Sequence, residues 1–184
     1  VNMLSSGAEA LYARSATVED MRLGVSTYSF WHFRGPRERL ESYIRRAHEH
    51  GFDGVEILVN HVESTARSYL AEVRRLAFTL GMDIYTVAIH NDFVHPDPWE
   101  REKQVRYTER WAEVAHYLGA KAVRLNSGRW RTIESFDELM EARGLEPPLP
   151  GYTNEDAFRW VVECIERVLP VAEDCGVVLA LENH

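Results

Sequence analysis

Six polar side chains that could do chemistry lie within or at the ends of short apolar runs: Glu56, His90, Arg124, Asn126, Glu182 and His184. Alternation along an extended strand places Ala180, Glu182 and His184 on one face. If the runs are neighbouring parallel strands, then carboxylate, imidazole, guanidinium and amide groups converge at one edge of a sheet. Such a set suits a polar substrate bound together with a divalent cation.

Each of these residues also has a purely structural interpretation. Glu182 is a metal ligand or one half of a salt bridge, because an unpaired buried carboxylate is costly. Arg124 either clamps a substrate hydroxyl or anion, or it pairs with Glu56 across the site. His90 contacts substrate or is a satisfied core histidine. His184 contacts substrate, orients a ligand or faces solvent, and Asn126 is polar lining.

The elements that must position these residues follow a repeated pattern of amphipathic helix, glycine and short apolar strand. The glycines that end the four helices are Gly51, Gly81, Gly119 and Gly176. Each occupies the position at a helix end where a residue commonly adopts the left-handed backbone conformation. Pro36, Pro98 and the pair Thr153 and Asp156 mark helix starts at 36, 98 and 154. With a further strand near Leu23–Thr27, five strands alternate with four helices, which predicts a parallel sheet.

Two observations favour an α/β fold of the (β/α)8 TIM barrel type over an open nucleotide-binding sheet. The turn after the first strand, Ser26 to Phe30, has no glycine for a phosphate, and the sequence ends on a strand at His184. We therefore expect residues 21–184 to be the N-terminal part of such a barrel, its first five strands and four helices, and residues 1–20 to be an N-terminal extension. The long segment from Arg129 to Tyr152 is expected to be a lid or a subunit contact.

Composition restricts the partners. The formal charge of −8 and the scattered arginines argue against nucleic acid, whose binding is dominated by phosphate contacts. No apolar run is long enough for a membrane span, and the two cysteines lie eleven positions apart on one predicted helix, too far to pair. We expect a cytoplasmic protein with a small-molecule partner, and by its fold a homo-oligomer. His61, His95 and His116 are expected at the surface.

The strand and helix phrases LGVSTYSF, HGFDGVEIL, AIHNDF, LGAKAVRLNSG and GVVLALENH resemble the sugar phosphate isomerase/epimerase family of xylose-isomerase-like TIM barrels. The resemblance implies that Glu182 binds a divalent metal (Mn2+, Mg2+ or Co2+) and takes part in proton transfer. The remaining ligands, an Asp, a His and a second catalytic Glu, would lie beyond residue 184. His90, Arg124 and Asn126 match polar positions near the substrate in that family, and Glu56 matches a glutamate of variable role.

The reaction implied is isomerisation or epimerisation of a small sugar, sugar phosphate or keto-polyol through an enediolate. Such a step needs a base beside the C–H bond and an electrophile for the developing oxyanion. One glutamate cannot return a proton to the opposite face, so a second acid/base is required. The alternatives are a metal-dependent dehydratase on the same scaffold, an endonuclease IV-like repair enzyme using histidines such as His61 and His90, and a non-catalytic barrel.

Overall fold

The computed structural model describes residues 21–182, which form a five-stranded parallel sheet with its strands in chain order. The strands are β1 (Gly24–Ser26), β2 (Gly54–Leu58), β3 (Asp83–Ala88), β4 (Ala122–Asn126) and β5 (Val178–Glu182). The parallel sheet predicted from the repeated pattern is confirmed. The predicted extension, residues 1–20, and the predicted site residue His184 lie outside the described residues.

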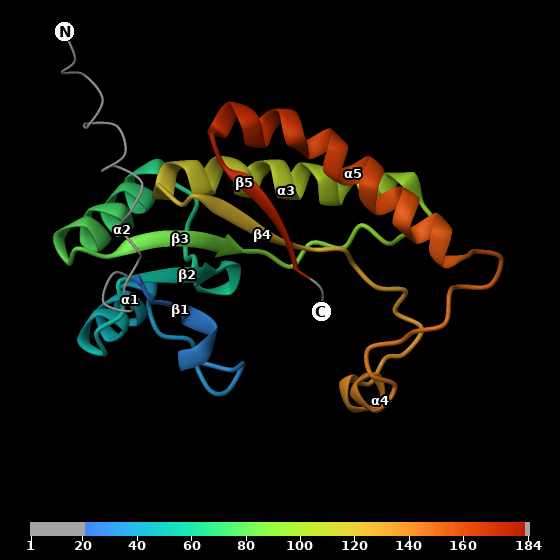
Figure 1. The fold of residues 1–184 in the computed structure, drawn as a ribbon, viewed down its shortest axis with the longest axis horizontal. Helices are drawn as coiled ribbons and strands as arrows, with labels where there is room; N and C mark the ends of the chain where they lie inside the picture. Colours follow the sequence, from blue (N-terminus) through green and yellow to red (C-terminus); the bar gives the residue numbers. More distant parts are fainter. Residues whose placement is uncertain (1–20, 183–184) are drawn as a thin grey trace, which may run out of the picture.

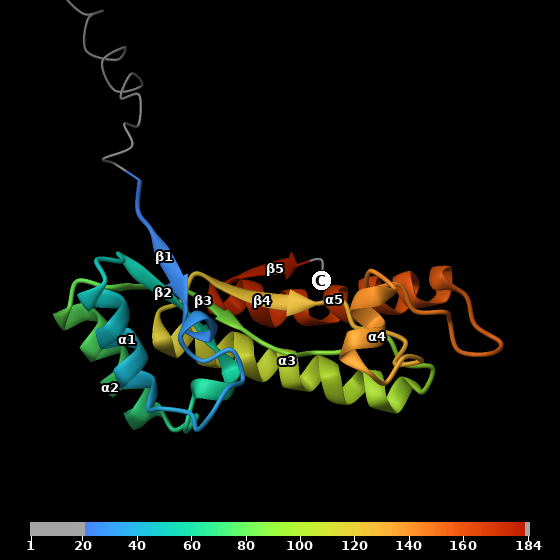
Figure 2. The same ribbon diagram turned by 90° about the horizontal axis from the view of Figure 1, so that it is seen from below.

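Helices α1 (Leu40–Glu49), α2 (Arg67–Thr79), α3 (Pro98–Leu118) and α5 (Asn154–Cys175) connect successive strands. Figures 1 and 2 show these four helices along one face of the curved sheet, with the opposite face left open. A fifth helix, α4 (Phe136–Glu141), lies beyond the C-terminal end of β4. The four predicted helices are therefore confirmed. α4 is an additional helix that the sequence did not indicate, because it spans fewer than two turns and has little periodicity to detect. None of the helices among residues 21–182 is long and apolar enough to cross a membrane.

The main core lies between the sheet and the helices. Val55 and Ile57 of β2 and Val123 and Leu125 of β4 are fully buried against the helices. Their neighbours in sequence, Glu56 and Arg124, therefore face the open side, because side chains alternate along a strand. Most residues on the predicted apolar faces of the helices are buried. In α1 all four residues of that face are buried: Leu40, Tyr43, Ile44 and Ala47.

The helix ends follow most of the predicted signals. Gly119 (φ 77°) and Gly176 (φ 65°) end α3 and α5 in the left-handed conformation, and Thr153 and Asp156 form a reciprocal capping box. Pro36 does not start a helix, contrary to the prediction. α1 begins four residues later at Leu40, its first fully buried residue. The start of α1 is thus determined by packing of its apolar face and not by the proline at position 36.

Two small residues in register let an aromatic ring lie across the sheet. Gly24 of β1 pairs with Gly54 of β2, and a Cβ atom at either position would lie 2.5–2.9 Å from ring carbons of Tyr85. The register between β2 and β3 shifts between Val55 and Glu56, beside this ring. Glycine is required at both positions because of this close approach.

Candidate functional site

An arginine joins two carboxylates on the open face of the sheet. Arg124 Nε donates to Glu56 Oε2 at 3.1 Å, and Arg124 Nη1 donates to Glu182 Oε2. The three side chains come from β4, β2 and β5. The ion pair between Arg124 and Glu56, one of the two interpretations of Arg124 open from the sequence, is therefore present. We call Glu56, Arg124 and Glu182 the charged trio.

Burial differs along the charged trio. The side chains of Arg124 and Glu56 are 19% and 22% exposed, and that of Glu182 is 43% exposed. Within the described residues, Glu182 is thus the most accessible member of the charged trio. Its carboxylate can therefore reach a ligand as well as Arg124.

The tips of β3 and β4 are held together by a residue that the sequence analysis did not single out. The Asn91 side chain donates from Nδ2 to the Asn126 carbonyl oxygen at 2.6 Å and accepts the Asn126 N–H at 2.9 Å. Asn91 is buried. Asn126 lies opposite Glu182 in the β4–β5 register, so this contact fixes the strand end nearest the carboxylate. The buried Oδ1 atom of Asn126 has no hydrogen-bond partner among the described residues.

A cavity of about 330 Å³ lies over these strand tips, within the size range of small-molecule pockets. His90, Asn91, Asp92 and Asn126 line it from the sheet, and α4 contributes Phe136, Leu139 and Met140. His90 lies two residues past the end of β3, is exposed, and has its ring centroid 6.3 Å from that of Phe33. Of the predicted site residues, the structure thus brings His90 and Asn126 into one cavity and joins Glu56, Arg124 and Glu182 in the charged trio.

The far wall of this cavity belongs to the insertion segment, residues 127–153 between β4 and α5. Its organising group is Glu146, whose side chain is 3% exposed and pairs with Arg129 through two hydrogen bonds of 3.0 and 3.2 Å. Glu146 also accepts the backbone N–H groups of Arg131 and Ile133, both at 3.1 Å. Burial raises the pKa of Glu146, but these hydrogen bonds outweigh it, so the pKa lies below its ordinary value.

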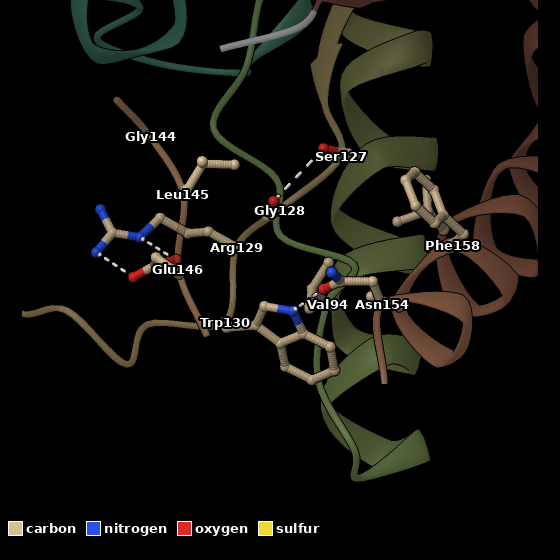
Figure 3. A pocket seen from close by; sticks show the side chains of 12 residues that line it. Val94, Ser127, Gly128, Arg129, Trp130, Gly144, Leu145, Glu146, Asn154 and Phe158 are labelled. Atoms are coloured by element: carbon tan, nitrogen blue, oxygen red, sulfur yellow. Dashed lines mark hydrogen bonds and ion pairs between the residues drawn. The ribbon is translucent and has the colours of Figure 1, made fainter. Parts of the chain in front are cut away.

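Figure 3 shows a second cavity, of about 290 Å³, on the other side of the same wall. Trp130 lines it and donates from its indole Nε1 to Asn154 Oδ1 at 3.0 Å, which ties the insertion segment to the start of α5. Ser127, Gly128, Arg129, Gly144 and Glu146 line both cavities. The Arg129–Glu146 ion pair therefore lies in the wall that the two cavities share.

His61 lies elsewhere, and its predicted surface position is wrong. It is 2% exposed, its Nδ1 is 2.9 Å from Thr27 Oγ1, and its ring stacks on Tyr43 at 4.2 Å between centroids. Burial, with the charge of Arg37 adding to it, lowers the pKa of His61 to about 4. This histidine is a packed neutral side chain that joins the end of β2 to the segment after β1. His95 and His116 are exposed, as predicted.

Comparison with known proteins decides the family. Residues 44–184 match the xylose isomerase-like TIM barrel family. This chain belongs to that family. The five-stranded sheet is accordingly part of a xylose isomerase-like barrel, whose active sites are built at the C-terminal ends of the strands. Glu182 is the last residue of β5, and the cavity lined by His90 and Asn126 lies over the ends of β3 and β4. Glu56 and Arg124 lie in the middle of their strands.

Solved structures share this fold. A D-psicose 3-epimerase with D-tagatose from Clostridium cellulolyticum H10 superposes with a TM-score of 0.69 at 19% identity, over 88% of this chain and 52% of its own. The probable 3-DHS dehydratase AsbF from Bacillus anthracis gives 0.60 at 16% identity, over 89% and 53%. The IolI protein, solved with a zinc atom, gives 0.62 at 16% identity, over 88% and 51%. The chain spans about half the length of these proteins.

Within the xylose isomerase-like barrel, the described part does not supply a complete metal site. No three His, Cys, Asp or Glu side chains among residues 21–182 are grouped so that they could hold a metal. Glu182 offers one accessible carboxylate, the ligand type that hard divalent cations prefer. The residues present therefore fit one position of a metal-ligand set. One oxygen of that carboxylate, Glu182 Oε2, accepts a hydrogen bond from Arg124.

Proposed function

We propose that this chain carries part of the active site of a divalent-metal-dependent isomerase or epimerase of a small sugar, sugar phosphate or keto-polyol. The observation that carries the proposal is the charged trio on the open face of a xylose isomerase-like sheet, with Glu182 at the C-terminal end of β5. Epimerase and zinc-bound neighbours share the fold, which supports the reaction class and the metal. Mn2+, Mg2+ and Co2+ are the candidate ions.

In this proposal Glu182 is the metal ligand and the acid/base that moves a proton at a carbon next to a carbonyl. A bound divalent cation would polarise that carbonyl. Arg124 donates to Oε2 of Glu182 and so restricts the orientation of this carboxylate. Glu56 completes the pairing of Arg124 and prevents the guanidinium from swinging out of the site.

His90 and Asn126 are proposed to bind substrate in the cavity over the strand tips. His184 is proposed to contact substrate beside Glu182. The second acid/base, needed to return the proton to the opposite face, and the other metal ligands would come from outside residues 21–182. A dehydratase remains the nearest alternative, since removal of the same proton begins elimination of water, and the fold of AsbF supports it.

The decisive experiment is exchange of substrate protons in D2O by the complete protein loaded with Mn2+. A panel of ketohexoses, their phosphates and keto-polyols is incubated with enzyme, and deuterium incorporation next to the carbonyl is measured by NMR. Because exchange reports proton removal, it detects isomerase, epimerase and dehydratase chemistry alike. Formation of an epimer, a positional isomer or a dehydrated product then separates the three.

The variant Glu182→Gln should lose exchange by about 100-fold or more, as is usual when a general base is removed. It should also weaken Mn2+ binding measured by calorimetry. Glu173→Gln, an exposed position on α5, is the matched control and should leave both unchanged. Undiminished turnover and metal binding in Glu182→Gln would contradict the proposed role.

We further propose a cytoplasmic homo-oligomer that binds neither nucleic acid nor membrane. Cys164 and Cys175 are both free thiols, which supports a reducing compartment. Light scattering of the purified protein tests the oligomeric state: a mass equal to a single chain would contradict that part of the proposal.

A further inference from the structure

We propose that a cavity between α2 and α3 binds a nucleoside monophosphate, with the phosphate on Arg67 and Arg74 and the base against Phe78. This cavity of about 490 Å³, here called the arginine cavity, is lined by Arg67, Ala71, Arg74, Arg75, Phe78 and Tyr117. It lies among the helices on one side of the sheet, whereas the charged trio lies on the open face (Figures 1 and 2). Ligand binding there is therefore independent of the proposed function.

A single stripe of α2 forms one wall of the arginine cavity. Arg67, Ala71, Arg74 and Phe78 are spaced i, i+4, i+7 and i+11, which places them on one side of the helix. The small side chain of Ala71 leaves space between the two arginines. Tyr117 lines the cavity from α3. A ligand that enters thus meets guanidinium groups and aromatic rings together.

The two guanidinium groups are positioned by α3 but are not paired with a carboxylate of residues 21–182. Arg67 Cζ lies over the Tyr117 ring, 4.6 Å from its centroid. Arg74 lies against the end of α3, since a Cβ at Gly119 would be 3.3 Å from Arg74 Nε. Neither guanidinium donates a hydrogen bond within the described chain, so the N–H groups are available to the oxygens of a phosphate.

The positive charge of the arginine cavity is not balanced by the helices that form it. Arg75 adds a third guanidinium to the lining. Glu72, the one acidic residue of α2, lies outside the stripe and forms no ion pair in the described part of the chain. Glu113, one turn before Tyr117 on α3, pairs with Arg110 at 2.8 Å. The cavity therefore attracts an anion.

The charge of the whole chain limits the size of that anion. The formal charge is −8, so a polyanion that extends beyond the cavity would be repelled by the acidic remainder of the protein. A mononucleotide carries a single phosphate group and avoids this repulsion. Phe78 is 85% exposed and lies one turn beyond Arg74. An aromatic base can stack on this ring while the phosphate contacts the arginines.

The test is calorimetric titration of the complete protein at low salt with AMP, adenosine and inorganic phosphate. AMP should bind at least about tenfold more tightly than the other two, because only AMP engages both the arginines and Phe78. Arg74→Gln should weaken AMP binding at least about fivefold. Arg45→Gln, which removes an exposed arginine of α1 without a carboxylate partner in the described residues, is the matched control and should leave AMP binding unchanged.

Phe78→Ser should weaken AMP binding at least about fivefold and leave phosphate binding unchanged. Phe158→Ser, at a position 72% exposed on α5, is its control and should change neither. An AMP affinity equal to that of adenosine or of inorganic phosphate would overturn the proposal. So would an Arg74→Gln or Phe78→Ser variant that binds AMP as its control does. Binding is measured without turnover, so a negative result leaves the proposed function and the D2O exchange experiment unaffected.

Discussion

The side chain of Asn91 and the backbone of Asn126 exchange two hydrogen bonds, of 2.6 and 2.9 Å, across the ends of β3 and β4. This contact extends the pairing of the two strands past Ala88, the last residue of β3, and it fixes Asn126, which lines the cavity and lies opposite Glu182 in the β4–β5 register. It is therefore the link between the two parts of the candidate site.

Asn91→Ala should lower the free energy of unfolding by about 1–3 kcal/mol, because it leaves the N–H and C=O groups of Asn126 without partners. Urea denaturation followed by circular dichroism measures this change. Thr65→Ala, at an exposed position, is the control and should have a much smaller effect. An equal loss in both variants would argue against a structural role for the Asn91 contact.

Arg124→Met should cost about 1–3 kcal/mol of unfolding free energy, between the values of exposed and buried ion pairs, since it leaves two carboxylates facing each other. The double variant Arg124→Met/Glu56→Gln should recover part of this loss by removing one of the stranded charges. Arg106→Met, which breaks a pair with Glu102 on the surface of α3, is the control. Absence of any recovery in the double variant would show that charge is not the cause.

His61 predicts a pH dependence of stability. Its pKa is lowered to about 4 in the folded protein, so between about pH 6.5 and 4 the unfolded chain binds more protons than the folded one. Stability should therefore fall as the pH falls through this window, by about 3 kcal/mol in total. Unfolding free energies at pH 7 and pH 4.5 should differ less in His61→Asn than in the parent, and His48→Gln, at an exposed position, should retain the parent's difference.

The glycines under Tyr85 should respond differently to alanine. A Cβ at Gly24 would lie within 3 Å of the Tyr85 ring alone, whereas one at Gly54 would also lie 2.5 Å from the Asp83 carbonyl oxygen. Each single variant should lose about 1–3 kcal/mol by overpacking. In double-mutant cycles with Tyr85→Ala, the Gly24 substitution should be relieved and the Gly54 substitution should stay costly. Equal relief at both positions would contradict the backbone contact at Gly54.

The features that the sequence predicted well are local ones. Helix faces, the left-handed glycines and the capping box at Thr153 depend on residues within a few positions of one another, so periodicity and end signals identify them. The parallel sheet follows because helices and strands alternate along the chain. The start of α1 was misplaced, because burial of Leu40 outweighs the proline signal at Pro36.

The features that the sequence did not predict depend on distant segments. His61 is buried because Trp31 and Tyr43 pack against it, and neither is near it in sequence. Asn91 becomes structural only through Asn126, 35 positions away, and Glu146 through Arg129 and the loop that follows it. A polar residue in a loop gives no signal of such a partner, so these contacts required the three-dimensional structure.

Arg124 is separated from Glu56 by 68 positions and from Glu182 by 58, on opposite sides in the sequence. During synthesis the chain emerges from its N-terminus, so Arg124 can meet Glu56 well before Glu182 leaves the ribosome. We therefore expect Arg124 to pair with one carboxylate first and to gain the second later. Closure of the charged trio coincides with docking of β5, and a probe of the Arg124–Glu182 ion pair would time the pairing of β4 with β5.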